Sequence, residues 1–365
     1  MSLDADGPGA DGPGADGPGA DGPGADGPGA DGPGADGPGA DGRRRSPWVL
    51  GSLSVLVAAL LAFHSAVPNA VGNLGSLLET FLPWLGLPAV ALLALASLRR
   101  SPAAIVAAIV PAVVWAVMFG AWVFPGSSPP GPAFPGAPEP PSVLTVLQHN
   151  VADDNATPAT TANALARAGA DLIALQELTL EALPVYEAAL TPEHPHRIIV
   201  GTVGLWSRYP LTDSRPLDIK PKAITADWNR GLRATVQTPA GDIAAYVAHL
   251  PSVRIRLQDG YGTAWRDESA TALGAAIAEE ELARIVLMGD LNGAVHDRGL
   301  SPLTSRLTPA LDGFAFTWPA AFPLARIDHI MTRDAPSTST WTLPSTGSDH
   351  LPTAARLDLR KTNPD

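Results

Sequence analysis

Three long apolar runs in the first third of the chain restrict its fold more than any other feature. They span residues 48–67, 74–98 and 103–124, and are 20, 25 and 22 residues long. A helix needs about 20 apolar residues to cross the hydrocarbon core of a bilayer. The first run alone could also be a signal peptide, because basic, apolar and small residues follow in that order. Two more runs directly behind it favour a transmembrane anchor of three helices over residues 43–124.

The arginines around these runs predict the orientation of the anchor. Residues 43–45 are three arginines before the first run, and Arg99 and Arg100 separate the second run from the third. Positively charged residues remain preferentially on the cytoplasmic side of a membrane. We therefore expect a multi-pass protein of the cell membrane with a cytoplasmic N-terminus. Everything after residue 124 would be extracytoplasmic.

The anchor separates two regions of very different composition. Residues 1–42 repeat Ala-Asp-Gly-Pro-Gly and carry nine aspartates, a composition that predicts a disordered anionic tail. Residues 125–142 are a proline-rich linker, and residues 143–365 are long enough for one substantial domain. The chain has no cysteine, which excludes disulfides and thiolate metal sites.

Within this domain, residues 285–292 form an apolar stretch that ends in two polar side chains. Residues two apart on a strand point to the same side, so Asp290 and Asn292 are expected to lie together at the end of a strand. The same pattern of an apolar strand followed by polar residues recurs along the domain. Ligand sites of α/β proteins gather at strand ends. The candidate site residues are Asn150, Glu177, His249, Asp290, Asn292, Asp328, Asp349 and His350.

Five short motifs then appear in a characteristic order. They are Leu175-Gln176-Glu177, Ser207-Arg208-Tyr209-Pro210, Gly289-Asp290-Leu291-Asn292, Arg326-Ile327-Asp328-His329-Ile330 and Ser348-Asp349-His350. Together they resemble the endonuclease/exonuclease/phosphatase superfamily, which includes deoxyribonuclease I, abasic-site endonucleases, neutral sphingomyelinases and inositol polyphosphate phosphatases. The resemblance covers roughly residues 143–359. It implies a four-layer α/β sandwich, in which two packed β-sheets are flanked by helices, here preceded by the three transmembrane helices.

The resemblance also implies a role for each candidate residue. Glu177 would be the main ligand of Mg²⁺, or alternatively of Mn²⁺, with Asn150 and Asp349 completing the metal environment. Oxygen ligands of this kind are those that Mg²⁺ prefers.

The remaining residues would act on the phosphate. Asp290 would orient or deprotonate the attacking water, and Asn292 would hold a phosphate oxygen. His350, paired with Asp328, and His249 would contact the phosphate or the leaving group. Whether Asp290 or His350 is the general base stays open.

Charge and tethering favour a lipid substrate. From residue 143 onward, 25 acidic residues outnumber 19 basic ones, which argues against nucleic acid as a partner. A catalytic domain tethered to a bilayer meets lipid headgroups at a high effective concentration. The order of the segments is similar to that of the actinobacterial VanJ-type teicoplanin-resistance proteins, which implies the polyprenyl pyrophosphate carrier of cell-wall synthesis as substrate. The expected partners are thus membrane lipids and a phosphorylated lipid or small molecule; no protein partner is implied.

Two rival functions remain. One is an extracytoplasmic nuclease, and the other is a membrane-anchored binding protein whose site is catalytically degenerate. The intact set of candidate residues argues against the second. Four arginines could grip a compact phosphate or could be solvated loop charges; they are Arg230, Arg233, Arg254 and Arg256.

Overall fold

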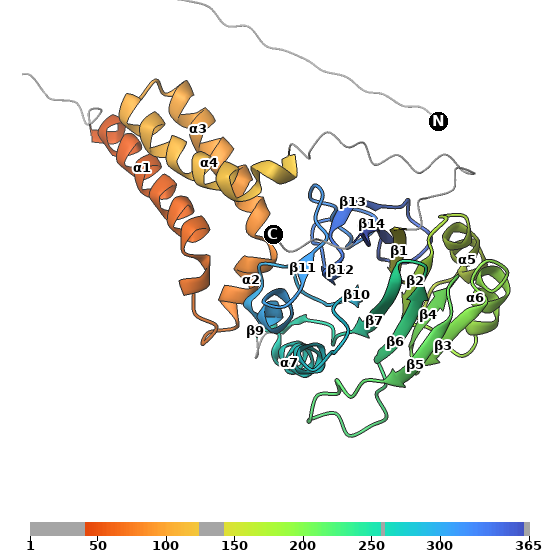
Figure 1. Cartoon of the computed structure of the whole chain (residues 1–365). Coiled ribbons are helices and arrows are strands. Elements are labelled where there is room, and N and C mark those ends of the chain that lie inside the picture. Colours follow the sequence, from red (N-terminus) through yellow and green to blue (C-terminus); the bar gives the residue numbers. More distant parts are fainter. Residues whose placement is uncertain (1–40, 124–141, 257–259, 361–365) are drawn as a thin grey trace, which may run out of the picture. The chain divides into compact units, whose positions relative to one another are not determined.

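The computed structural model describes residues 41–123, 142–256 and 260–360, with side chains from residue 48 onward. The predicted repeat tail up to residue 40 and the linker up to residue 141 lie outside the described residues. The helical N-terminal segment contains α1 (Asp41–Ala62), η1 (His64–Ala66), α2 (Leu74–Thr80), η2 (Leu82–Leu85), α3 (Gly86–Leu98) and α4 (Pro102–Val123) (Figure 1).

The second apolar run is bent rather than straight. The chain turns by 77° between α2 and the helical residues Leu82–Leu98. Pro83 lies in the first turn after the bend, and it has no N–H with which to continue the hydrogen bonds of α2. Phe81 is the single residue between the two helical pieces. The second apolar run is thus two helices at an angle, and it counts as a span only if the bent pair crosses the membrane as one.

The anchor prediction is supported in part. Among the described residues, α4 is long and apolar enough to cross a membrane, and the bent pair would count as a second span. The apolar part of α1, Trp48–Ala62, is shorter than a full span. Large apolar side chains of these helices nevertheless face outward, among them Val55, Val90 and Val117. An exposed apolar surface of this kind marks a membrane or protein contact.

The rest of the described chain is built on two six-stranded sheets. The first contains β1 (Val143–Asn150), β2 (Leu172–Gln176), β3 (His196–Val200), β4 (Val203–Ser207), β13 (Ser337–Thr342) and β14 (Thr353–Asp358). The second contains β5 (Leu211–Pro216), β6 (Gly231–Thr238), β7 (Gly241–His249), β10 (Ile285–Asp290), β11 (Thr308–Pro309) and β12 (Asp328–Arg333). A small ribbon joins β8 (Arg254–Arg256) to β9 (Gly260–Gly262).

The two sheets have related topologies. The first has the order β13-β14-β1-β2-β4-β3 and the second β11-β12-β10-β7-β6-β5. Each contains one parallel pair at its centre, β1 with β2 and β7 with β10, between antiparallel neighbours. A parallel pair needs a crossover connection, which in both sheets contains a helix.

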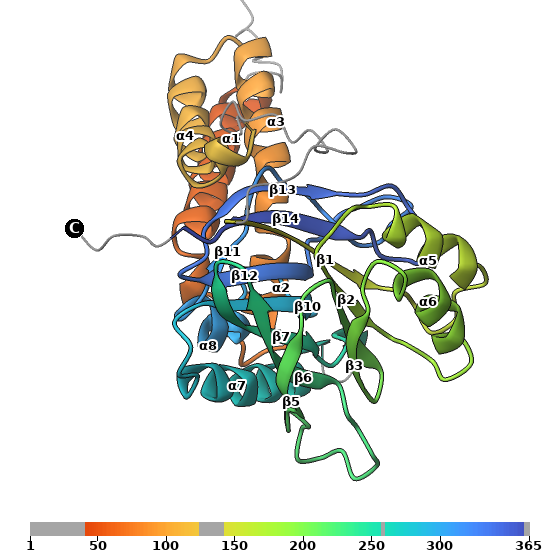
Figure 2. The same ribbon diagram turned by 45° about the vertical axis from the view of Figure 1, so that its right-hand side comes forward.

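Helices cover the outer face of each sheet (Figure 2). The helices α5 (Pro158–Ala166) and α6 (Leu183–Leu190) pack on the first sheet. On the second lie α7 (Ala264–Ala278), α8 (Ser301–Thr304) and the short η3 (Arg298–Leu300). The predicted architecture of two packed sheets flanked by helices is confirmed.

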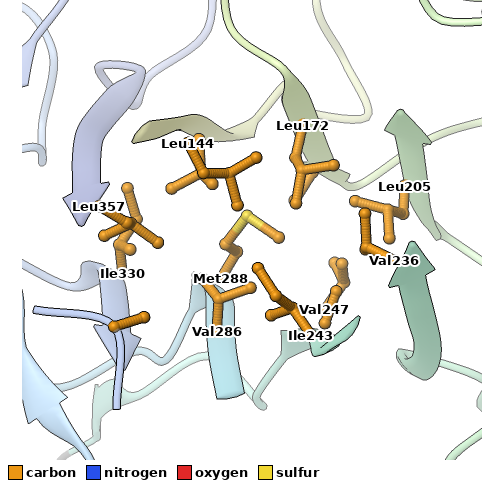
Figure 3. Close-up of a cluster of buried hydrophobic side chains, with 14 of the residues drawn as sticks. Leu144, Leu172, Leu205, Val236, Ile243, Val247, Val286, Met288, Ile330 and Leu357 are labelled. Carbon is orange, nitrogen blue, oxygen red and sulfur yellow. The ribbon is translucent and has the colours of Figure 1, made fainter. Parts of the chain in front are cut away.

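The main core lies between the sheets. Strand side chains from both sheets meet there, as Figure 3 shows for Leu144 and Leu172 opposite Val286 and Met288. These residues alternate with side chains that point to the outer helices, because successive residues on a strand face opposite sides. Both faces of each central strand are therefore apolar, and polar residues gather where the strands end.

The helical segment also packs against the two-sheet domain. Trp84 of η2 donates a hydrogen bond from Nε1 to the carbonyl oxygen of Leu324 at 2.7 Å, and its ring stacks on Phe316 with centroids 5.5 Å apart. Near the end of α4, Trp122 stacks on His296 at 5.6 Å. Aromatic contacts of this type add to the free energy gained by burial alone.

Candidate active site

The parallel pairs bring the predicted residues to one edge of the sandwich. In the first sheet Asn150 pairs with Gln176, so Glu177 follows directly beside it. In the second sheet Asp290 pairs with His249. Because β1 packs across the core against β10, the ends of both pairs meet, and a hydrogen bond joins Asn150 to Asp290.

The close approach of the neighbouring strand explains why a glycine, Gly289, precedes Asp290. A Cβ atom at this position would lie 1.9 Å from the carbonyl oxygen of Ala248 on the neighbouring strand β7. No side chain fits at such a distance, so a larger residue would push β10 away from β7. The glycine thus keeps Asp290 within reach of His249.

Asp328, Asp349 and His350 reach this edge in a different way from that predicted. We expected them at the C-terminal ends of strands, but Asp328 is the first residue of β12, and His350 lies in the loop before β14. The strand β12 is antiparallel to β10 and pairs Asp328 with Asp290, while β14 is antiparallel to β1. The start of an antiparallel strand lies beside the end of its neighbour, so the residues still converge.

Asn150 links two carboxylates at the centre of the site. Its Nδ2 atom donates to Glu177 Oε1 and to Asp290 Oδ2, each at 3.0 Å. Its Oδ1 atom accepts from the backbone N–H of Ala152 at 3.0 Å, which fixes the orientation of the amide. The nitrogen atom of Asn150, and not the oxygen that a metal would require, therefore faces the carboxylates.

Two residues of the site have a left-handed backbone. Glu177 has φ 58° and Asn292 has φ 48°. Asparagine tolerates this region, but for glutamate it costs on the order of 1–3 kcal/mol. Backbone N–H groups stabilise both turns: Asp153 donates to Glu177 Oε2 at 3.1 Å, and Asn292 donates to Asp290 Oδ1 at 2.9 Å. Strain of this kind is concentrated at functional sites.

His350 and Asp328 form a buried couple. His350 Nδ1 lies 2.8 Å from Asp328 Oδ2, and both side chains are at least nine-tenths buried. Burial alone would lower the pKa of His350, but the carboxylates of Asp328 and Asp290 outweigh it and raise the pKa to about 10. Burial would raise the pKa of Asp328, yet the charge of His350 lowers it to about 2. The pair is consequently ionic, with His350 Nε2 3.9 Å from Asp290 Oδ2.

Unlike the ionic His350–Asp328 pair, Asp290 and His249 both tend toward their neutral forms. Burial, followed by repulsion from Asp328, raises the pKa of Asp290 to about 7. Burial and the nearby Arg230 lower the pKa of His249 to about 3, so this imidazole is neutral at physiological pH. His249 Nε2 lies 3.5 Å from Glu177 Oε1 and 3.7 Å from Asp290 Oδ2. A carboxyl group that titrates near neutral pH is suited to proton transfer.

A pocket of about 1090 Å³ opens above these residues. Glu177, Asp290 and His350 line its floor, whereas Asp349 is exposed at the rim and accepts a hydrogen bond from Trp318 Nε1 at 3.2 Å. Trp318 has no sequence signal that singles it out, because it is one of four aromatic residues in a loop-rich stretch, residues 313–322. The sequence did not indicate its place in the site.

The four arginines divide between the site and the rest of the domain. Arg230 and Arg254 line the pocket. Arg233 instead bonds Glu280 at 2.9 Å on the outer side of the second sheet, because its position on β6 faces away from the core. Arg256 lines a neighbouring hollow. Of the four arginines that were candidates for binding phosphate, Arg230 and Arg254 are thus the ones that line this pocket.

The donor set fits a hard divalent cation. The carboxylates of Glu177 and Asp290 both lie within 3.0 Å of the same amide nitrogen, so two acidic groups face one small space. Asp290, Asp328 and His350 also bring one ligand atom each to within 4.8 Å of one another. Asp328 Oδ2 and His350 Nδ1 bond each other, so the oxygen donors that would hold a metal are those of Glu177 and Asp290, each of which also accepts one hydrogen bond.

Comparison with known proteins agrees with this geometry. Residues 147–350 match the endonuclease/exonuclease/phosphatase family. The chain belongs to this family. Members of the endonuclease/exonuclease/phosphatase family are hydrolases that act on phosphodiester bonds. A comparison with curated proteins gave no match.

Solved structures of the family share the fold with this chain. An endonuclease/exonuclease/phosphatase family protein from Bacteroides thetaiotaomicron is 18% identical, with a TM-score of 0.51 over 59% of this chain and 97% of that one. A family protein from Bacteroides vulgatus is 19% identical, with a TM-score of 0.51 over 60% of this chain and 99% of that one. Beta toxin from Staphylococcus aureus is 14% identical, with a TM-score of 0.50 over 58% and 99%. At such identities the likeness concerns the fold alone.

Proposed function

We propose that this protein is a membrane-anchored, Mg²⁺-dependent phosphoesterase that hydrolyses a lipid-linked phosphate or pyrophosphate on the outer face of the membrane. The observation that carries the proposal is the single buried centre in which Asn150 joins Glu177 to Asp290 beside the His350–Asp328 couple. A cluster of acidic groups next to a charged histidine suits hydrolysis of a phosphate ester, since this reaction requires an activated water and neutralisation of phosphate charge.

Glu177 and Asp290 would hold the metal ion. When bound, Mg²⁺ supplies positive charge that polarises the phosphoryl oxygens. Asp290 accepts the proton of the attacking water: burial raises its pKa, and a bound cation favours its ionised form, which is the form that takes up a proton. We therefore assign the role of general base to Asp290 rather than to His350.

The remaining side chains bind and stabilise the phosphoryl group. His350 is held in its charged form by Asp328 and faces Asp290, so it offers a positive charge to a phosphoryl oxygen. Asn292 lines the pocket, and its Nδ2 donates to the carbonyl oxygen of Leu250 at 2.9 Å, which leaves the second N–H of the amide for a phosphoryl oxygen. As the oxygen of water bonds to phosphorus, the bond to the leaving oxygen breaks and that oxygen takes a proton from solvent, while Asp290 keeps the proton of the attacking water until it is released.

The lipid part of the proposal is supported by the helical segment. It exposes apolar side chains along α3 and α4, and α4 has the length of a membrane span. The acidic balance of the domain and the resemblance in layout to VanJ-type proteins favour a phosphorylated lipid over nucleic acid. Orientation toward the outer face follows from the arginines that flank the helices.

Purified full-length protein in detergent tests the proposal. With Mg²⁺ we expect release of phosphate from a long-chain polyprenyl pyrophosphate, no nicking of supercoiled plasmid, and loss of activity on chelation. Glu177→Ala should lower the rate by at least about 100-fold because the metal loses a ligand. Glu193→Ala, which changes an exposed carboxylate that does not line the pocket, is the matched control and should retain full activity.

The alternatives give different results. Nicked plasmid without phosphate release would replace the lipid substrate by nucleic acid. Full activity of Glu177→Ala would disprove the proposed metal site.

A further inference from the structure

One wall of the catalytic pocket comes from the helical segment. Thr80 and Phe81, at the bend between α2 and η2, line the same pocket as Glu177, Asp290 and His350. Residues more than 90 positions apart in the chain thus share one cavity. We refer to Thr80 and Phe81 as the elbow.

Hydrogen bonds hold the elbow against the domain. Asn73 Nδ2 donates to the carbonyl oxygen of Tyr261 at 2.8 Å, and the Tyr261 N–H donates to the carbonyl oxygen of Gly72 at 2.9 Å. The hydroxyl groups of Thr80 and Tyr261 lie 3.1 Å apart. Contacts at both ends of α2 therefore fix the position of this helix, which ends at the elbow.

A buried ion pair completes the attachment. The Glu79 carboxylate is 1% exposed and lies next to the elbow. It accepts hydrogen bonds from Arg298 Nε at 2.9 Å, from Arg298 Nη2 at 2.8 Å and from the backbone N–H of Arg298 at 3.0 Å. Burying a carboxylate in an apolar helix costs free energy unless the carboxylate is paired. This contact therefore specifies where α2 packs on the domain.

The pocket is lined by several charged and polar side chains and by an apolar wall of Leu178, Leu180 and Ile255. Leu180 is 87% exposed and Ile255 is 77% exposed, and both line the pocket together with Phe81 and Leu178. Large side chains of this type gain free energy when an apolar ligand covers them. The exposed apolar residues of α3 follow Phe81 along the chain.

We propose that the elbow and the adjoining apolar wall are the binding subsite for the hydrocarbon chain of the substrate, with Phe81 as its specificity-determining residue. This inference rests on the proposed phosphoesterase function. The phosphate binds at the floor beside Glu177 and Asp290, and the chain runs along Phe81 toward the apolar helices. The elbow therefore selects substrates with long hydrocarbon chains over water-soluble phosphates.

The test compares two substrates that carry the same reacting group. Full-length protein in detergent is assayed with a long-chain polyprenyl pyrophosphate and with isopentenyl pyrophosphate, which has a single isoprene unit. Phe81→Ser should lower kcat/KM for the long-chain substrate by about tenfold, mainly through KM, because contact between Phe81 and the chain is lost. The rate with isopentenyl pyrophosphate should change less than about twofold, since its chain is too short to fill the subsite.

Two further variants separate binding from folding. Phe81→Leu keeps an apolar side chain and should restore most of the selectivity. Phe63→Ser makes the same change at an exposed phenylalanine of the helical segment that does not line the pocket, and should leave both rates unchanged.

Each outcome has a distinct meaning. An equal loss on both substrates, or no loss on either, would overturn the subsite while leaving the phosphoesterase function intact. A wild-type protein that hydrolyses neither substrate would overturn the proposed function itself, and the subsite with it.

Discussion

The surroundings of Asp290 raise the pKa of its carboxyl group into the neutral range. It is buried beside Asp328 and within 4 Å of two histidines of opposite character, one neutral and one charged. The charged form of Asp290 gains from Asn150 and from the backbone of Asn292, but burial outweighs both. The site thus separates the roles of its two buried carboxylates, since Asp328 stays ionised while Asp290 titrates.

This difference predicts the acid limb of the pH profile. As the pH falls through about 7, Asp290 takes up a proton and can no longer accept one from water, so kcat/KM should decrease. A bound cation favours the ionised carboxylate, so saturating Mg²⁺ should move this limb to lower pH. A rate measurement across the pH range at two Mg²⁺ concentrations checks both statements. A limb that does not move with Mg²⁺ would show that the titrating group is remote from the metal.

At the scale of single residues, the sequence predicted charged and polar residues of the pocket but not Phe81 or Trp318. Glu177, Asp290 and Asn292 follow apolar strands within short motifs, and a strand end is visible in the sequence. Phe81 and Trp318 join the pocket through packing between distant segments. No local pattern encodes such a contact, so it could not be predicted.

Among the elements, α2 depends on the pair Glu79–Arg298. The two partners differ in exposure, because Glu79 is 1% exposed and Arg298 is 31% exposed. Arg298→Met should therefore destabilise the protein by about 3–5 kcal/mol, since it leaves a buried carboxylate without its main partner. Glu79→Gln should cost only about 1 kcal/mol, because the remaining guanidinium can reach water.

Thermal unfolding of both variants in detergent measures this asymmetry. The double variant Glu79→Gln with Arg298→Met is the control and should be more stable than Arg298→Met alone. Equal destabilisation by the two single variants would contradict the burial argument.

On the outer side of the second sheet, Glu280 links α7 to β6 and β7. Burial opposes the charge of Glu280, but hydrogen bonds from Arg233 and Tyr246 lower its pKa from 4.5 to about 2. The stabilisation is present above the ordinary pKa and is lost as the pH falls toward the folded value. The free energy of unfolding should therefore decrease between pH 4.5 and about 2. Denaturant titrations should show a smaller decrease for Glu280→Gln.

The elements themselves were predictable where they are long and apolar. Central strands such as β1, β2 and β10 appear in the sequence as apolar runs, and α7 as a long helix-compatible stretch. The strands β5 and β13 carry no such signal, because they read Leu-Thr-Asp-Ser-Arg-Pro and Ser-Thr-Ser-Thr-Trp-Thr and lie at sheet edges. Their pairing is decided by the neighbouring strand rather than by their own composition.

At the scale of the whole molecule, the helical segment does more than tether the domain. A tether alone needs no contact with the part that it holds, whereas here tryptophans, a buried ion pair and a tyrosine join the two parts. The sequence predicted an anchor and a catalytic domain as separate units. Their contact could not be foreseen, because it depends on a bend at Phe81 and on loops such as residues 313–325.

The elbow has a kinetic consequence for the proposed enzyme. If the hydrocarbon chain enters along Phe81, the substrate arrives by diffusion in the plane of the bilayer. The concentration that governs the rate is then the mole fraction of substrate among the lipids, and not its amount per volume of solution. Diluting the substrate with inert lipid should slow the enzyme even when the total amount of substrate in the vessel stays constant.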